Sequence, residues 1–232
     1  MVSLLRGLAA LFCFALFSIG GFILSLILLL PLSKKSALKL VAFIWKGLAL
    51  LFWILGLGCY NLTRLKQVKG SVIVANHPSL IDVVLLTAFL PNTFSAAKHV
   101  LRKNPFFGRV VRSVFLSDDQ HLLEEAGPLL AAGYNVLIFP EGTRSPATGC
   151  NPFKLGAAQL ALRTGAPIQP IRIEMSERIL AKDQPIWRIG AQRIRCTFTS
   201  LEPIQPIVKE GQSLHQAASE ITRTLHQILS VK

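Results

Sequence analysis

Two long apolar runs set the first seventy residues of the chain apart from the rest. From Gly7 to Ser33, 27 consecutive residues carry no charge. About 20 helical residues cross a hydrocarbon core of ~30 Å, so this run is long enough to span a membrane. A second apolar run, Gly47 to Thr63, has 17 residues and is marginal as a span. The pattern predicts a membrane-anchoring helical segment over residues 1–68.

The charges around these runs bear on how the anchor lies. Residues 1–81 contain no acidic residue and eight basic ones, Arg6, Lys34, Lys35, Lys39, Lys46, Arg64, Lys66 and Lys69. The positive-inside rule places both flanks of the second run in the cytoplasm, which a single crossing cannot satisfy. Two helices that dip into the inner leaflet satisfy it, and one span followed by an interfacial helix is also compatible. We expect the eight basic side chains to lie at lipid headgroups.

The composition points to the same environment. The chain is 51% hydrophobic and 16% charged, with a net charge of +13. Ordinary soluble domains contain ~25% charged residues, so a disordered or ordinary cytosolic protein is disfavoured. Nucleic acid would suit the charge but not the apolar excess, and is not an expected partner. The four cysteines are widely spaced without a CxxC pair, so we expect neither disulfides nor a metal, and no cofactor.

After Gly70 the pattern changes to short apolar runs that alternate with helical stretches. This is typical of an α/β fold, and we expect a mixed central sheet flanked by helices over residues 69–232, behind an N-terminal two-helix membrane anchor. The predicted strands are Val72 to Ala75, Thr93 to Ala97, Val136 to Phe139, Pro167 to Ile173 and Arg193 to Phe198. The predicted helices are Ser79 to Phe89, Gln120 to Ala132, Lys154 to Thr164 and Ser213 to Leu229.

The first predicted strand runs into the polar turn Asn76-His-Pro-Ser79. His77 therefore falls at the carboxyl end of a strand, where open α/β sheets place ligands. Asp82 follows within one helical turn and can point back toward the imidazole, holding one tautomer while the other nitrogen takes a proton from a hydroxyl. The alternative is a capping turn, with Asp82 placed near the positive end of the helix.

A second loop, Pro140 to Ser145, follows the strand Val136 to Phe139 and also contains one acid and one base. Arg144 beside Gly142 and Thr143 suits a phosphate, because the guanidinium donates to two oxygens and glycine permits close approach. Glu141 can pair with Arg144 or accept a hydrogen bond from a polyol hydroxyl. The alternative is an ordinary turn with an ion pair.

These segments resemble the glycerolipid acyltransferases. Asn76-His-Pro-Ser-Leu-Ile-Asp82 resembles the HxxxxD box of that family, and Phe139-Pro-Glu-Gly-Thr-Arg-Ser145 resembles its third box. Lys98-His-Val-Leu101 through Asn104-Pro-Phe-Phe-Gly108 resembles the second box, and Ala166-Pro-Ile-Gln-Pro170 the fourth. All four occur in order within residues 70–175.

The resemblance implies acyl transfer from acyl carrier protein or coenzyme A to a lysophospholipid, foremost 1-acyl-sn-glycerol-3-phosphate giving phosphatidate. It implies His77 as general base and Asp82 as its orienting partner. It implies a phosphate site of Lys98 and Arg144, with Glu141, Gly142 and Thr143 shaping the glycerol site. It also implies an enzyme of the bacterial inner membrane with its catalytic domain in the cytoplasm.

One departure leaves the acceptor open. The second box of the family commonly ends in Asp-Arg, but Val114-Phe-Leu-Ser-Asp-Asp-Gln120 has no arginine there. The charge can come from Arg102, Lys103, Arg109 or Arg112, or the acceptor differs. The variant resembles acyltransferases of aryl-polyene or other specialised lipid assembly.

A serine hydrolase would need a GxSxG elbow, which is missing, and a non-catalytic lipid-binding module remains the alternative outside enzymes.

Overall fold

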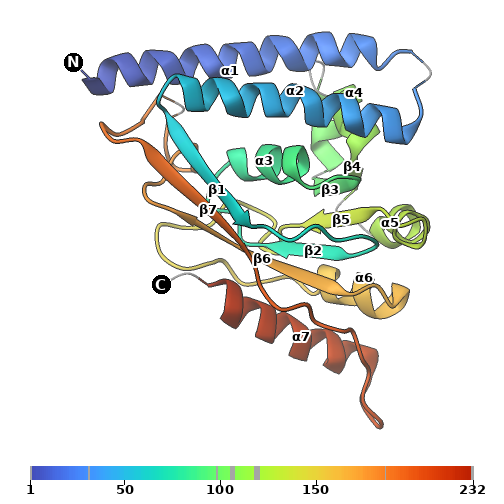
Figure 1. Ribbon diagram of the computed structural model, residues 1–232. Coiled ribbons are helices and arrows are strands. Elements are labelled where there is room, and N and C mark those ends of the chain that lie inside the picture. Colours follow the sequence, from blue (N-terminus) through green and yellow to red (C-terminus); the bar gives the residue numbers. More distant parts are fainter. Residues whose placement is uncertain are drawn as a thin grey trace.

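The computed structural model describes residues 2–30, 32–97, 99–104, 108–117, 121–185 and 187–230. It begins with two long helices, α1 (Val2–Ile27) and α2 (Lys34–Ile54), which run antiparallel along one side of the molecule (Figure 1). Both are long and apolar enough to cross a membrane, judged by length and composition. Only 17% and 33% of their most apolar windows are buried inside the protein, so neither is an ordinary core helix.

The prediction for the second apolar run is wrong in its bounds. Helix α2 starts at Lys34, where the Ser33 side chain accepts a hydrogen bond from the Ser36 N–H, and it ends at Ile54. Gly56 then takes a positive φ of 67° and turns the chain into a strand, β1 (Gly58–Arg64). The sheet therefore begins before the expected boundary at residue 68, because an uninterrupted apolar run does not distinguish a helix from a strand.

A mixed sheet of seven strands forms the centre of the protein, in the order β1-β7-β6-β2-β5-β3-β4. Strands β6, β2, β5, β3 and β4 are parallel, whereas β7 runs antiparallel to β6 and parallel to β1. The remaining bounds are β2 (Val72–Ala75), β3 (Thr93–Ala97), β4 (Phe115–Ser117), β5 (Asn135–Ile138), β6 (Ile168–Met175) and β7 (Ile194–Ser200). The five predicted strands are confirmed within two residues, while β1 and the three-residue β4 were not predicted.

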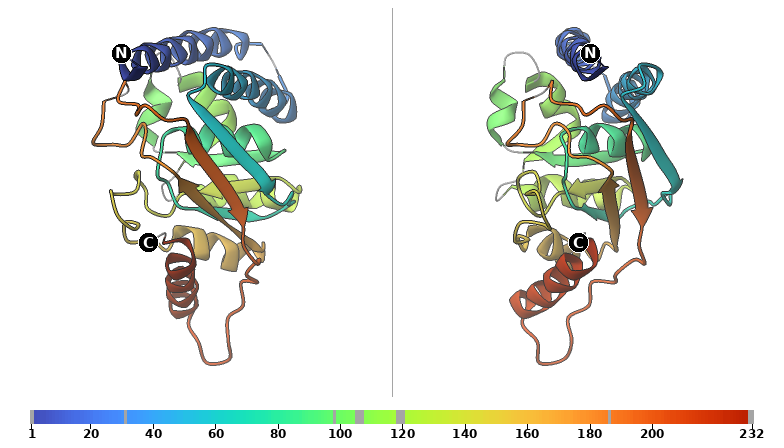
Figure 2. Two further views of the ribbon diagram at one scale, coloured as in Figure 1. Left: turned by 60° about the vertical axis from the view of Figure 1, so that its left-hand side comes forward. Right: turned by 90° about the vertical axis from the view of Figure 1, so that its left-hand side faces the viewer.

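Helices cover both faces of the sheet. They are α3 (Ile81–Phe89), η1 (His99–Lys103), α4 (Gly108–Val114), α5 (Leu122–Ala131), α6 (Gly156–Thr164) and α7 (Leu214–Leu229). Figure 2 shows α7 on the side of the sheet opposite to α1 and α2. Val72 and Val74 belong to one core cluster with α6 and α7, whereas Ile73 and Ala75 pack with α3. The strand is thus buried on both faces, as parallel strands in α/β folds are.

Arg6 makes four hydrogen bonds within the protein. Its guanidinium donates hydrogen bonds to backbone carbonyl groups before β1 and before β7. These hydrogen bonds attach α1 to the α/β part of the chain, and the placement of the basic side chains at lipid headgroups stays a prediction.

The sheet order also places two loops together. Because β2 and β5 are parallel neighbours, with Val74 opposite Ile138, the residues that follow the two strands lie side by side. These residues are the two polar loops singled out from the sequence.

Candidate active site

His77 and Asp82 form a hydrogen-bonded pair at the carboxyl end of β2. The Nδ1 of His77 lies 3.1 Å from Oδ2 of Asp82. The Ser79 N–H donates to the same oxygen at 2.7 Å. With Asp82 ionised, Nδ1 carries the hydrogen, and Nε2 is left as a base. The expected contact between the two side chains is confirmed.

Asp82 is fully buried, whereas 14% of the His77 side chain is exposed. Burial raises the pKa of Asp82, and the hydrogen bond and charge of His77 act against this rise. Its second oxygen, Oδ1, is buried without a hydrogen-bond partner among the described residues. The carboxylate is therefore held in place at a cost in desolvation, which is typical of a functional site.

Glu141 joins the two polar loops. Its Oε1 accepts hydrogen bonds from the His77 N–H at 3.0 Å and from the Ser145 hydroxyl at 2.6 Å. Its Oε2 accepts from both the backbone and side-chain nitrogens of Asn151, each at 2.8 Å. The Ser145 N–H donates to the His77 carbonyl at 2.7 Å. Through Oε1 Glu141 holds the His77 backbone, and through Oε2 it holds Asn151; the expected pairing with Arg144 is not found among its described contacts.

Two further contacts hold His77, one at the residue before it and one at its ring. Asn76 exchanges hydrogen bonds with the backbone of Ile173, donating to its carbonyl at 2.9 Å and accepting from its N–H at 2.8 Å. The side chain therefore extends the β2–β6 ladder at the residue before the histidine. The His77 ring stacks on Phe139, with centroids 4.1 Å apart. This stacking restricts rotation of the His77 side chain about its χ angles.

His77 opens onto a polar cleft with a volume of about 410 Å³. Its apolar side is formed by β3, β4 and β5, and its charged side by Arg144, Lys154 and Lys182. Leu80, Phe139, Pro140, Gly142 and Thr143 also line the cleft. The cleft therefore combines one base with three cations, a combination suited to an anionic substrate that contains a hydroxyl group.

Arg144 is held by the loop between β6 and β7. Its guanidinium donates to the carbonyl of Leu180, a residue with a positive φ of 49°. Burial lowers the pKa of Arg144, and the nearby Asp183 opposes the shift. Gly142 has a φ of 65°, and a Cβ there would lie 2.9 Å from the Nζ of Lys154. The positive φ favours glycine at this position, and the flexible Lys154 side chain lies directly against it.

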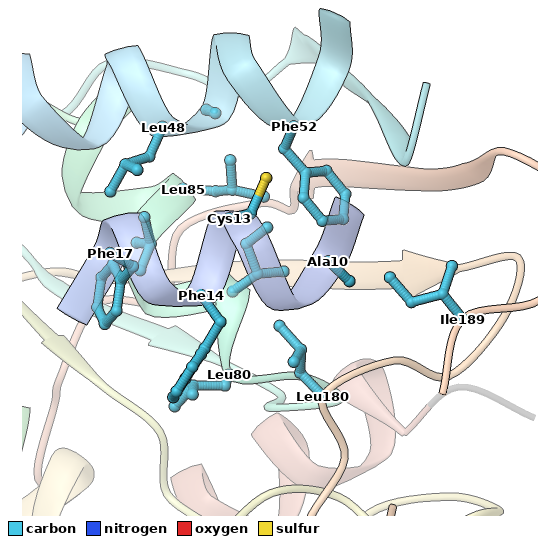
Figure 3. A pocket seen from close by; sticks show the side chains of 13 residues that line it. Ala10, Cys13, Phe14, Phe17, Leu48, Phe52, Leu80, Leu85, Leu180 and Ile189 are labelled. Atoms are coloured by element: carbon cyan, nitrogen blue, oxygen red, sulfur yellow. The ribbon is translucent and has the colours of Figure 1, made fainter. Parts of the chain in front are cut away.

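A second cavity, of about 90 Å³, lies on the other side of Leu80. Figure 3 shows its wall of side chains from α1, α2, α3 and the β6–β7 loop. Phe14 of α1 reaches toward Leu80, which lines both cavities. The wall is apolar and consists of Ala10, Cys13, Phe14, Phe17, Leu48, Ala49, Phe52, Leu80, Ile81, Val84, Leu85, Leu180 and Ile189. We name it the apolar cavity; it adjoins the histidine loop, and its volume has room for only the end of a hydrocarbon chain.

The identity of this arrangement follows from comparison with known proteins. A family model described as Acyltransferase matches residues 57–174, about half of the chain. The chain belongs to the acyltransferase family. The matched residues include both polar loops and the strands that position them.

Two relatives in this family share the same name, 1-acyl-sn-glycerol-3-phosphate acyltransferase. The protein of Cocos nucifera is 29% identical over 172 residues, which cover 68% of this chain and 52% of that protein. The protein of Haemophilus influenzae is 31% identical over 116 residues, which cover 46% of this chain and 48% of that protein. The chain therefore spans about half the length of these relatives.

A solved structure extends the likeness to the whole fold. The crystal structure of the 1-acyl-sn-glycerophosphate (LPA) acyltransferase PlsC from Thermotoga maritima has a TM-score of 0.66 and 23% identity to this chain. The match covers 97% of this chain and 95% of that one, so the N-terminal helices are part of the shared fold.

The cations expected around the second acyltransferase box have other contacts. Arg102 donates to Glu125 at 2.8 Å and to the Phe115 carbonyl at 3.3 Å. Arg112 donates to the Arg102 carbonyl at 2.6 Å. Lys103 is exposed, and Lys98 lies outside the described residues. The described contacts of Arg102 and Arg112 thus join η1, α4, β4 and α5, and neither side chain lines the cleft.

Sequence reasoning missed Lys154, Lys182 and Asn151. Lys154 lies beyond the third acyltransferase box, and its backbone N–H donates to Pro140. Lys182 comes from the β6–β7 loop, which carries no recognisable signal. Asn151 follows a turn ten residues after Glu141. These residues meet at the site only because the chain folds back, so sequence spacing contained no indication of their roles.

Proposed function

We propose that this chain transfers an acyl group from the thioester of acyl carrier protein or coenzyme A to the free hydroxyl of a lysophospholipid. We take 1-acyl-sn-glycerol-3-phosphate as the acceptor, which gives phosphatidate. The observation that carries the proposal is the His77–Asp82 pair, with His77 lining the polar cleft and Leu80, three residues on, lining both the cleft and the apolar cavity. The family and the names of the relatives support it.

The reaction needs one proton relay. Nε2 of His77 takes the proton from the acceptor hydroxyl as its oxygen attacks the thioester carbonyl carbon. The resulting imidazolium is stabilised by Asp82 through Nδ1. Collapse of the tetrahedral intermediate breaks the C–S bond and leaves the ester, and the departing thiolate takes the proton from His77. A thioester is already activated, so positioning and charge stabilisation supply the rest of the catalysis.

The charged side of the cleft would hold the acceptor. Arg144 presents guanidinium N–H groups, and Lys154 and Lys182 add two ammonium groups to the same cleft. We assign the acceptor phosphate to these cations and, by the family resemblance, to Lys98. Gly142 and Thr143 would border the glycerol. Glu141 would act as a positioning residue through the His77 backbone, and not as a contact to glycerol.

The two N-terminal helices would hold the enzyme at the bilayer. Large hydrophobic side chains of α1 remain exposed, among them Leu4, Leu8, Phe12, Ile19 and Ile23. Because α1 and α2 lie alongside the α/β part of the chain (Figure 1), we favour helices embedded in one leaflet. The membrane would be the bacterial inner membrane, with the catalytic part in the cytoplasm. Flotation with lipid vesicles tests the association.

A single-turnover assay tests the acyl transfer. Purified protein in lipid vesicles is mixed with a labelled acyl thioester and 1-acyl-sn-glycerol-3-phosphate. We expect His77→Ala to slow transfer by about 10²–10⁴-fold, the usual contribution of a general base. The control is His215→Ala, which removes an exposed histidine of α7. Transfer by His77→Ala at the parent rate would refute the base assignment. Absence of transfer by the parent protein to this acceptor, with transfer to another lipid hydroxyl, would correct the acceptor.

A further inference from the structure

Arg6 joins α1 to two segments that are distant in sequence. It donates to the Gly56 carbonyl at 2.8 Å and the Leu57 carbonyl at 3.2 Å, in the turn before β1. It also donates to the Gly190 carbonyl at 2.8 Å and the Gln192 carbonyl at 2.7 Å, before β7. The guanidinium thus binds four carbonyl groups at once. A lysine has only three N–H donors on a single nitrogen and cannot reproduce this fork.

The next residue brings the same two parts of the chain into close contact. A Cβ at Gly7 would lie 2.9 Å from the carbonyl oxygen of Trp187, so any larger residue would push α1 away from the β6–β7 loop. Arg6 and Gly7 therefore form one seam between α1 and this loop.

The seam continues into the apolar cavity. Ala10, Cys13, Phe14 and Phe17 follow at helical spacing, and all four side chains line the cavity (Figure 3). The opposite wall includes Ile189, which lies next to the Gly190 carbonyl bound by Arg6. One arginine thus sets the separation between two walls of the cavity. An arginine at a bilayer surface needs only water or headgroups, so anchoring does not account for these four contacts.

We propose that Arg6 is a positioning residue for acyl-chain selection, and that α1 is a wall of the substrate site as well as a membrane anchor. The inference rests on the proposed acyl transfer. The cavity is small, so only the end of a long acyl chain would enter it. Loosening the seam would widen the cavity and weaken the packing of that end, whereas a short chain would not reach it. The ratio of kcat/KM for a long acyl donor to that for a short one therefore reports on the seam.

The experiment uses the full chain in vesicles of phosphatidylethanolamine and phosphatidylglycerol. The kcat/KM ratio of hexadecanoyl to octanoyl donor is measured for Arg6→Met, Arg6→Lys and the parent. We expect the ratio to fall about fivefold or more in Arg6→Met and less in Arg6→Lys, since each methylene that loses its packing weakens binding several-fold. Lys35→Met is the control, because it removes an exposed positive charge from α2. Gly7→Ala opens the same seam without a change in charge and should lower the ratio as well.

A second measurement does not depend on acyl transfer. Cys13 lines the cavity, so its rate of modification by methyl methanethiosulfonate, followed by peptide mass spectrometry, reports on access to the wall. We expect this rate to rise several-fold in Arg6→Met and Gly7→Ala but not in Lys35→Met, with vesicle flotation unchanged. Equal losses for both donors, or an unchanged Cys13 rate in both seam variants, would overturn the proposal. If the parent transfers no acyl group, the proposed function fails, and the Cys13 rates still decide whether Arg6 positions the wall.

Discussion

The polar cleft and the apolar cavity meet at Leu80 but are built in different ways. The polar cleft depends on two short loops after neighbouring strands, and hydrogen bonds between Glu141, His77 and Ser145 fix its geometry. The apolar cavity combines side chains from α1, α2, α3 and the β6–β7 loop, and is shaped by packing. Under the proposed function, the reacting groups would lie on loops held by neighbouring strand ends, whereas acyl-chain selection would depend on the packing of helices against the β6–β7 loop.

The largest effect that tests this contrast is expected from Asp82→Asn. The amide can still accept from Ser79, but it no longer stabilises imidazolium, so we expect kcat/KM to fall by about 10²–10⁴-fold. The thermal midpoint should not fall, because the change removes the buried charge whose desolvation raises the pKa of Asp82. A variant that loses both activity and stability would show that Asp82 is a structural residue. Rates and thermal unfolding of the same preparations provide the measurement.

The stability difference between this variant and the parent should depend on pH. The pKa of Asp82 is raised in the folded state above its ordinary value of 3.8. The folded state therefore binds the Asp82 proton more tightly than the unfolded state does. This contribution to stability is fully present below the ordinary pKa and is lost as the pH rises through the folded-state pKa. An asparagine does not titrate, so the Asp82→Asn variant does not lose stability in this way. The thermal midpoint of the variant minus that of the parent should therefore increase from acidic to neutral pH. If the difference between the two thermal midpoints stayed constant across this pH range, the buried Asp82 charge would not be the cause of the stability difference.

A smaller effect, confined to the polar cleft, is expected from Arg144→Ala. The loss of the guanidinium should reduce kcat/KM for the acceptor by about 10–100-fold, in line with a charge-assisted hydrogen bond to phosphate. Slow hydrolysis of the donor by water should stay close to the parent rate. Arg163→Ala, an exposed arginine of α6, is the matched control. Equal losses in transfer and hydrolysis would assign Arg144 a structural role through Leu180.

The smallest effect is expected from the apolar cavity alone. Cys13→Phe adds volume to its wall, so use of a hexadecanoyl donor should fall about 3–10-fold relative to an octanoyl donor. Leu11→Phe makes a similar addition to an exposed position of α1 and should leave the ratio unchanged. A parallel change in both variants would indicate an effect on membrane association, and would remove the distinction between the two regions.

The contrast also explains what the sequence alone could predict. His77, Asp82 and Arg144 follow strands within a few residues, so a pattern of short apolar runs was sufficient to place them at one edge of a parallel sheet. Glu141 was found for the same reason, but its role was not, because its partner Asn151 reaches it through a turn. The strand Gly58–Arg64 does not stand out within its apolar run, since its pairing with Ile194–Ser200 depends on residues more than 130 positions away.

The contacts of Arg6 have a consequence for the order in which the protein assembles. Its acceptor at Gly190 lies 184 residues further along the chain. At roughly 5–20 residues per second, ribosomes need roughly 10–40 s to synthesise that interval. During this time α1 can already reach the bilayer, but the cavity wall that it shares with Ile189 does not yet exist. Helix α1 therefore gains its final neighbours only after the loop that contains Ile189 has been made, and its docking closes a contact of very high sequence separation, a slow kind of folding step.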